Sequence, residues 1–239
     1  MHSRRALTDR WPRVTHVTPA TAPSSPPAPA RHTGVFVAFE GGDGAGKSTQ
    51  VRRLAAVLRR AGHEVLETRQ PGGTPLGAAL RELVLHGDHV APRAEALIYA
   101  ADKAHHVDTV IGPALVAGQV VLSDRYIDSA VAYQGGGRDL GAAEIADLQL
   151  WAVNHLVPDL TVVLDVTPQD GRSRRGDVHD RLEAEGDDFH QAVREQFLAL
   201  AAAHPERYLV LDSTLAPEQI HIAVVDRLAA TGLAVEATR

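Results

Sequence analysis

The stretch that most constrains this chain is "VFVAFEGGDGAGKST" at residues 35–49. An apolar, β-forming run leads straight into glycines, and apolar residues then recur every three or four positions from Lys47, which predicts a strand, a loop and a helix. The spacing G-x-x-x-x-G-K-[ST] is typical of a loop whose backbone N–H groups hold phosphates, with a lysine charge and a serine ligand for Mg²⁺. The sequence therefore predicts a nucleoside triphosphate site. Its predicted residues are Gly41, Gly42, Asp43, Gly44, Ala45, Gly46, Lys47, Ser48 and Thr49.

Strand-like and helix-like segments then alternate to the end of the chain. We expect strands at 35–40, 64–68, 119–124, 160–166 and 207–212. We expect helices from Lys47 to Gly62, near 75–86, from Arg93 with a kink or restart at Pro113, and at 142–155, 187–203 and 217–230. Such alternation predicts an α/β fold with a parallel sheet covered by helices on both faces.

The charge of the chain is unevenly distributed. The net charge is -6; residues 1–33 hold five arginines against one aspartate, a balance of +4, which leaves -10 for residues 34–239. A body with a negative excess is a poor candidate for nonspecific nucleic-acid binding, because phosphates are neutralised by a positive surface. No run of 18 apolar residues occurs, so no membrane partner is predicted.

Residues 1–33 differ from the rest in composition. Six of the fourteen prolines lie there, and the apolar content is too low to offset the entropy of ordering, so we expect a disordered extension. A targeting segment, a basic tether and a partner-binding proline stretch are possible functions. A dispensable extension, or a true start farther downstream, is favoured over all three. Residues 34–239 are expected to form one domain, with a lid at about 170–186.

Metal and GTPase signatures are weak. The adjacent pair His105 and His106 lacks the spacing partners of a zinc site, and there are no cysteines, which suits a reducing compartment. We therefore expect no structural metal. The single asparagine, Asn154, is followed by His155, so the base-reading Asn-Lys-x-Asp motif of switch GTPases is missing.

Five further motifs follow in a fixed order and resemble those of the thymidylate kinase family. They are "TRQPGGT" (68–74), "EALIYAADKAHH" (95–106), "DRYIDSAVAYQGGG" (124–137), "GRSRRGDVHDRLE" (171–183) and "DST" (212–214). The resemblance implies a P-loop NTPase fold in three layers with a five-stranded parallel sheet. It also implies phosphorylation of dTMP to dTDP for dTTP synthesis, with ATP and Mg²⁺ as cofactors. The implied partners are small-molecule nucleotides and a second copy of the chain, in the cytoplasm.

Two arginines follow predicted strand ends. Arg69 and Arg125 are expected at the same carboxyl edge of the sheet, where paired guanidinium donors form a clamp for a monophosphate. Each of these arginines, taken alone, is equally consistent with a structural ion pair. Asp124 is expected to reach Mg²⁺ with Ser48, directly or through water, a role compatible with a helix cap.

The acceptor base is expected against the helix that carries Tyr99 and Lys103, which share a face because they lie four residues apart. The family stacks an aromatic ring on thymine and presents an arginine to O4; Tyr99 and Lys103 hold these positions here. By resemblance, Ser129 and Gln134 contact the base edge, Tyr133 excludes ribose and Asp43 contacts the 3′-hydroxyl. Core aromatics and a solvated lysine are the alternatives. A second departure is Gln70, where relatives often carry glutamate.

The arginine that neutralises the transferred group is expected in the lid, because the phosphate loop carries no arginine. This pattern is similar to the subclass with catalytic arginines in the lid. The predicted catalytic residues are Lys47, Arg125, Arg172, Arg174 and Arg175, while Arg181 is assigned to ATP. A solvated basic face is the alternative. For the whole chain, the alternatives are another deoxynucleoside monophosphate or nucleoside kinase, and a catalytically silent nucleotide-binding relative.

Overall fold

Five parallel strands form a single sheet in the order β2-β3-β1-β4-β5 in this computed structural model, which describes residues 32–174, 180–231 and 233–234. The extension predicted at 1–33 lies almost wholly outside these residues. The strands are β1 (Val35–Glu40), β2 (Val65–Arg69), β3 (Val120–Asp124), β4 (Leu160–Asp165) and β5 (Tyr208–Asp212). The α/β prediction with five parallel strands is confirmed.

Helices cover both faces of the sheet. The helical segments of the first half are α1 (Lys47–Arg60), α2 (Pro75–His86), α3 (Pro92–His106), the π-helical η1 (Val107–Ile111), α4 (Gly112–Val116), α5 (Ile127–Ala130) and the π-helical η2 (Val131–Gly137). Those of the second half are α6 (Ala142–Ala152), α7 (Pro168–Arg174), α8 (Asp187–Ala203) and α9 (Pro217–Ala229). Within these described residues, no helix has both the length and the apolar character needed to cross a bilayer.

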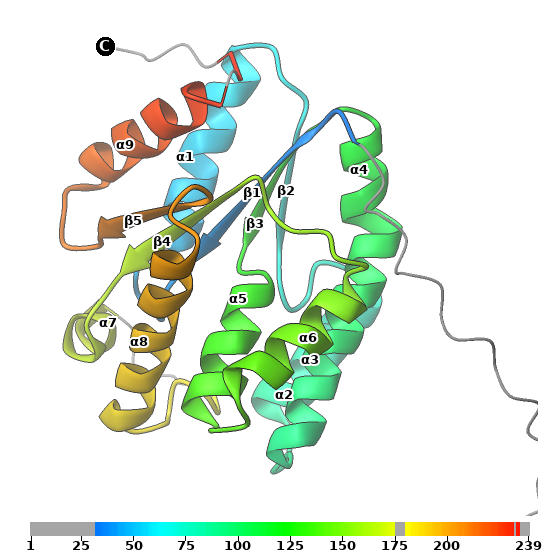
Figure 1. The fold of residues 1–239 in the computed structure, drawn as a ribbon, viewed down its shortest axis with the longest axis vertical. Coiled ribbons are helices and arrows are strands. Elements are labelled where there is room, and N and C mark those ends of the chain that lie inside the picture. The colour runs from blue at the N-terminus through cyan, green and yellow to red at the C-terminus, as the bar shows by residue number, and fades with distance from the viewer. Residues whose placement is uncertain (1–31, 175–179, 232, 235–239) are drawn as a thin grey trace, which may run out of the picture.

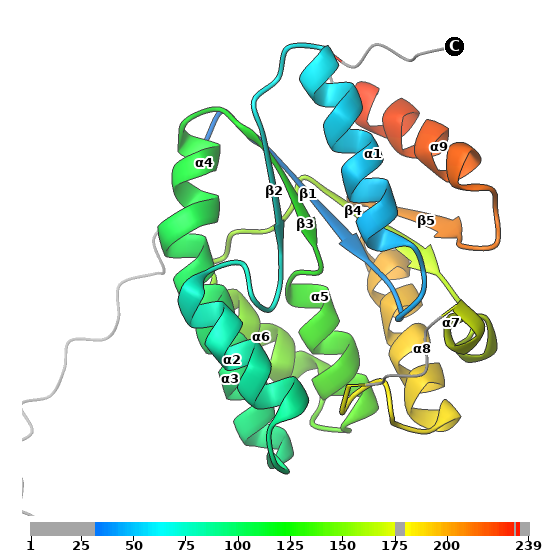
Figure 2. The same cartoon turned by 180° about the vertical axis from the view of Figure 1, so that it is seen from behind.

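The core is divided by the two faces of the strands. Because side chains alternate along a strand, Val37 and Phe39 pack with α1 and α9, whereas Phe36 and Ala38 pack with η1 and α4. Figures 1 and 2 show α1 and α9 on one face, with α5 and α8 on the other. The apolar strands β1, β3 and β4 are therefore buried on both sides, whereas the edge strands β2 and β5 are partly exposed.

One predicted helix ends three residues early, and the long helix after residue 92 is interrupted near Pro113 as expected. The helix expected at 142–155 ends at Ala152, because Asn154 and His155 take left-handed backbone angles, φ 51° and 57°, that a helix cannot continue. The long helix from residue 92 changes to a π-helical turn at Val107 and resumes as α4 with Pro113 in its first turn. Pro113, which has no N–H to donate, falls at this change of helix type, directly after the Gly112 N–H that bonds to Val107 O.

The carboxyl ends of the three adjacent strands β2, β3 and β1 lie together. Phe39 of β1 and Arg69 of β2 are both register partners of Asp124 in β3. The segments that follow these strands therefore leave the sheet at one edge, as expected for ligand binding in a doubly wound fold.

Candidate active site

The phosphate loop connects β1 to α1 and depends on glycine. At Gly41 the backbone has φ 126°, and an added Cβ would lie 2.3 Å from the carbonyl oxygen of Leu164. Gly46, with φ 95°, occupies the N-cap of α1. The loop therefore turns its backbone toward the helix N-terminus, which is the arrangement that binds phosphate.

Lys47 is folded back along this loop. Its Nζ donates to the carbonyl oxygens of Gly41 at 2.9 Å and Gly42 at 2.8 Å. Burial lowers the pKa of Lys47 to about 8, and the nearby charge of Arg125 acts in the same direction. The lysine is thus held beside the loop as a poorly solvated positive charge, which an anionic phosphate would stabilise.

Ser48 and Asp124 provide hard oxygen atoms at the start of α1 and the end of β3. The Ser48 hydroxyl donates to Asp124 Oδ2 at 2.5 Å, and both residues line the cavity of the phosphate loop. Elsewhere in the part of the chain that the structure describes, no cluster of three His, Cys, Asp or Glu side chains could hold a metal. A Mg²⁺ ion fits here only as Mg²⁺ usually binds nucleotides, with one or two protein oxygens, waters and phosphate oxygens.

Arg125 lies at the centre of the site in a strained conformation. Its backbone has φ 70°, and it is fixed on both sides by its N–H to Phe39 O at 2.9 Å and by Ser123 Oγ donating to its carbonyl at 2.7 Å. The guanidinium donates to Gly41 O at 3.2 Å and to Ser129 Oγ at 3.0 Å. A left-handed non-glycine residue that is held this firmly is typical of a functional position.

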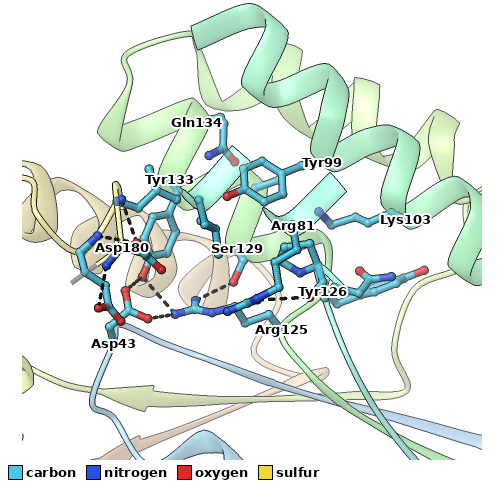
Figure 3. Close-up of a pocket in the computed structure, with 16 residues that line it drawn as sticks. Asp43, Arg81, Tyr99, Lys103, Arg125, Tyr126, Ser129, Tyr133, Gln134 and Asp180 are labelled. Atoms are coloured by element: carbon cyan, nitrogen blue, oxygen red, sulfur yellow. Dashed lines mark hydrogen bonds and ion pairs between the residues drawn. The ribbon is translucent and has the colours of Figure 1, made fainter. Parts of the chain in front are cut away.

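Asp43 and Tyr133 complete the network around Arg125. Arg125 pairs with the Asp43 carboxylate, and the Tyr133 hydroxyl donates to Asp43 Oδ2 at 2.8 Å. Burial alone would raise the pKa of Asp43, but the charges of Arg125 and Lys47 hold it well below its usual range. The structure thus joins the phosphate loop to the 125–133 segment through one charged pair (Figure 3).

Glu40, at the end of β1, is a buried carboxylate that the sequence reasoning missed. Its oxygens accept hydrogen bonds from Tyr126 N at 2.7 Å, Ser129 N at 3.2 Å and Ser129 Oγ at 2.5 Å. Burial raises the pKa of Glu40 to about 7, and the charge of Asp128 adds to this shift. The only sequence signal was a charged residue at the end of an otherwise apolar strand.

The second cavity lies beside this network and is lined by Tyr99, Lys103 and Gln134. Tyr99 and Lys103 share a face of α3 as predicted, and the Lys103 ammonium lies 5.4 Å from the centre of the Tyr99 ring. Burial lowers the pKa of Lys103 to about 8, while the charge of Asp102 opposes this shift. Figure 3 shows these side chains on one side of the cavity and Asp43 and Arg125 on the other.

Arg81 is a second residue that the sequence reasoning missed. It comes from α2 and lines both cavities, and its Nη1 donates to Pro71 O at 3.2 Å. Arg69, whose side chain is exposed, lines the phosphate-loop cavity but not the cavity that contains Tyr99 and Lys103. The two predicted clamp arginines, Arg69 and Arg125, are therefore brought to one cavity together with Arg81, which the helical pattern of α2 did not distinguish from a surface arginine.

Gln70 is buried and contacts the ring of His106. Burial lowers the pKa of His106 to about 4, so its ring is neutral near pH 7, and Gln70 Nε2 donates to its Nδ1 at 3.0 Å. The other ring nitrogen then carries the proton and donates to Thr68 Oγ1 at 2.8 Å. An ionised glutamate at position 70 could contact this ring only as an acceptor, with the proton of His106 on Nδ1.

The lid arginines are placed differently from one another. Arg172 pairs with Asp187, and Arg174 Nη1 donates to Ser213 O at 3.0 Å in the segment after β5. The side chain of Arg181 is directed toward α2 and α3, where it donates to Val84 O at 3.0 Å and pairs with Glu95. Arg175 lies outside the described residues. The structure therefore does not bring Arg181 to the phosphate loop, and its assignment to ATP stays a prediction.

The comparisons with known proteins agree with one another. The sequence profile of the thymidylate kinase family matches residues 39–224. Thymidylate kinase from Clavibacter sepedonicus is 60% identical over 185 residues, covering 76% of this chain and 88% of that protein. Thymidylate kinase from Bifidobacterium longum strain NCC 2705 is 50% identical over 196 residues, covering 80% of this chain and 95% of that protein.

A solved structure shows the same arrangement of elements. The crystal structure of thymidylate kinase from Ehrlichia chaffeensis superposes with a TM-score of 0.70 at 30% sequence identity. The match covers 82% of this chain and 98% of that one. The likeness thus extends over almost the entire solved chain.

Proposed function

The chain belongs to the thymidylate kinase family, and on that premise we propose that it transfers the γ-phosphoryl group of ATP to dTMP, giving dTDP and ADP for dTTP synthesis. It is a nucleoside monophosphate kinase, a phosphotransferase. One observation carries the proposal of dTMP as the acceptor. The phosphate-loop cavity and the base cavity share Asp43, Gln70, Arg81 and Arg125, so that a donor and an acceptor nucleotide would meet phosphate to phosphate at their common wall.

ATP is the proposed donor, with its phosphates on the loop from Gly41 to Thr49. Lys47 contributes charge to the β- and γ-phosphates, and Ser48 with Asp124 would hold Mg²⁺, directly or through water. Bound there, Mg²⁺ would neutralise phosphate oxygens during transfer. Both protein oxygens lie in the wall of the phosphate-loop cavity, which supports this assignment.

dTMP is the proposed acceptor. Arg69, Arg81 and Arg125 bind its phosphate, since guanidinium groups match phosphate oxygens with paired donors. Tyr99 stacks on the base and Lys103 donates to O4, while Ser129 and Gln134 lie at the base edge. In the same proposal the Tyr133 ring excludes a 2′-hydroxyl and Asp43 accepts from the 3′-hydroxyl. Apart from Arg69, these side chains line one cavity, which supports their assignment.

The transfer needs no general base. The acceptor phosphate has a second pKa of about 6 and is largely dianionic near pH 7. One of its oxygens forms the new P–O bond as the bond to ADP breaks, and ADP leaves with the electron pair. Lys47, Arg125 and the lid arginines Arg172, Arg174 and Arg175 are the proposed groups that neutralise the charge on the transferred phosphoryl oxygens.

The proposal includes a homodimer located in the cytoplasm, where ATP is available. Support for the dimer comes from large apolar side chains exposed on the neighbouring helices α2, α3 and α6: Leu76, Leu83, Leu97 and Trp151. Trp151 is 76% exposed, and such a grouping on adjacent helices is typical of an interface.

The test is a substrate panel. ADP release would be followed with ATP, Mg²⁺ and one acceptor at a time: dTMP, dUMP, dCMP, dGMP or the ribose analogue of TMP. We expect a strong preference for dTMP and little turnover of the ribose analogue. Turnover that does not discriminate would instead favour a broader monophosphate kinase, a candidate that Lys103 in place of arginine keeps open. Binding of ATP without turnover of any acceptor would favour a catalytically silent relative.

A further inference from the structure

The amide of Gln134 is oriented by one buried carboxylate. Gln134 Nε2 lies 2.9 Å from Glu95 Oε1, and Glu95 on α3 is fully buried. The hydrogen-bond partners of Glu95 among the described residues are three donors, from Gln134, Arg138 and Arg181. A carboxylate held by donors can only accept, so the NH₂ group of Gln134 must face Glu95. Its carbonyl oxygen is then the atom available to the cavity.

This orientation gives the wall of the cavity a hydrogen-bond polarity. Lys103 presents N–H donors and Gln134 presents a carbonyl acceptor, and both line the same cavity. A 4-oxo pyrimidine offers an acceptor at O4 and a donor at N3, which matches this order. Cytosine offers a donor amino group and an acceptor N3, which opposes it at both positions. An amide turned the other way would remove half of this discrimination.

The same carboxylate is bonded to the lid. Arg181 pairs with Glu95, and its other guanidinium nitrogens donate to Val84 O at 3.0 Å and Val90 O at 3.4 Å. These bonds fix the segment that begins at residue 180, whose residues Asp180, Leu182 and Glu183 line the acceptor cavity. The Glu95 side chain therefore bonds both to Gln134, which faces the base cavity, and to Arg181, which lies in the segment that lines that cavity.

We propose that Glu95 is a positioning residue for base selection: it holds the Gln134 amide so that the cavity takes a base with a 4-oxo group and an N3–H, and through Arg181 it holds the lid segment over that base. The inference rests on the proposed function, because it concerns the acceptor of the same reaction. Glu95 itself contacts no substrate in this proposal and acts through Gln134 and Arg181.

The test is Glu95→Gln, which preserves shape but lets the facing amide of Gln134 turn. Arg138 keeps its 2.5 Å ion pair with Glu185, and Arg181 keeps its two carbonyl partners, so the cations are not left unpaired. We expect the ratio of kcat/KM for dTMP to that for dCMP to fall by about tenfold or more, the scale of one reversed hydrogen bond to a base. Glu185→Gln removes a carboxylate from the same cluster without touching Gln134, and should leave the ratio unchanged.

A double variant separates positioning from general damage. In a Gln134→Leu background, Glu95→Gln should produce no further change in the dTMP to dCMP ratio, even where the thermal midpoint falls. An equal fall in the ratio with and without Gln134, or an unchanged ratio in the single variant, overturns the proposal. If Glu95→Gln does not fold, a neutron crystal structure of the parent with dTMP, which locates the amide hydrogens, decides: a Gln134 NH₂ group that faces the base overturns it.

Failure of the proposed function gives a different result. If the parent protein phosphorylates neither nucleotide, the same variants would be titrated with dTMP and dCMP by calorimetry. A dTMP preference in binding that Glu95→Gln weakens supports the role of Glu95 without supporting the reaction. Absence of binding of either nucleotide to the parent overturns both.

Discussion

Both lysines of this chain are buried, whereas its other 22 basic residues are arginines. Lys47 lies on the phosphate loop and Lys103 in the acceptor cavity, and burial lowers the pKa of each to about 8. An arginine at either position would stay charged at any pH that the fold tolerates. At residue scale, the choice of lysine therefore makes the charge of both cavities sensitive to pH just above neutrality.

Binding of dTMP should weaken as pH rises from 7 to 9. Lys103 has a depressed pKa of about 8, so it is mainly an ammonium below pH 8 and mainly a neutral amine above it. A charged donor to O4 is stronger than a neutral one by about 1 kcal/mol, or about fivefold in affinity. The phosphate charge of dTMP changes little over this range because its second pKa is about 6.

The measurement is the dissociation constant of dTMP without ATP, in the parent and in Lys103→Arg. Arginine keeps its charge, so the variant should lose the part of the pH dependence that comes from Lys103 and show a clearly shallower profile. Glu40 and Lys47, with pKa values of about 7 and about 8, titrate in both proteins and set the remaining slope. Glu40, Asp102 and Arg125 also act on Lys103, and all three remain in both proteins. Equal slopes in the two proteins would show that Lys103 is not the titrating group.

At the scale of elements, α7 packs directly on the phosphate loop. A Cβ added to Gly171 would lie 2.6 Å from the carbonyl oxygen of Asp43, and one added to Gly44 would lie 2.6 Å from the carbonyl oxygen of Gly171. Two backbones approach this closely only where neither residue carries a side chain. The helix that carries Arg172 and Arg174 is thus positioned by the same loop that would hold the phosphates.

Gly171→Ala should therefore weaken ATP binding by about tenfold, because the new Cβ forces α7 and the loop apart by a distance that is large against hydrogen-bond tolerances. The substitution disturbs only the contact between α7 and the phosphate loop and leaves the rest of the core unchanged, so the thermal midpoint should fall by only about 2 to 4 °C. Titration with ATP and a thermal melt measure the two effects. Ser173→Ala, on an exposed position of the same helix, is the matched control. Unchanged ATP affinity in Gly171→Ala would contradict the proposed contact.

At the scale of the whole molecule, the two sides of the sheet differ in exposed apolar surface. Trp151, Leu97 and Leu83 are exposed on α6, α3 and α2, which lie side by side in both views of the fold. The exposed large apolar side chains of β5, α9 and the segment between them are Val210, Leu215 and Ile222. The homodimer proposed above would bury the first group.

Trp151→Glu should convert a dimer into a monomer at micromolar concentration, because it places an unpaired charge in an apolar interface. Light scattering with size exclusion would show the mass fall from twice 25.5 kDa to the single-chain value. Ile222→Glu, which adds the same charge on α9, should leave the parent mass unchanged. A parent protein that is monomeric, or a dimer that tolerates Trp151→Glu, would remove this surface from the interface.

Local sequence determined the framework of this protein. The spacing of Gly41, Gly46, Lys47 and Ser48 predicts a strand, loop and helix by itself, because each signal acts within a few residues. The alternation of apolar strands with amphipathic helices likewise predicts the parallel sheet, and strand ends then place Arg69 and Arg125 at one edge. These predictions of the fold were correct because the spacing of apolar residues and the positions of turn-forming residues depend only on residues that are close in the sequence.

Only the tertiary structure decided which distant side chains meet. The bonds from Glu95 to Gln134 and Arg181 join residues 39 and 86 positions apart, and no periodic pattern encodes such a pair. Arg81 likewise resembles any surface arginine of an amphipathic helix until α2 is packed beside both cavities. Hydrogen bonding between buried polar groups depends on packing that brings three elements together. The sequence therefore determines the scaffold and the phosphate loop, while the polarity of the acceptor cavity is determined by tertiary packing.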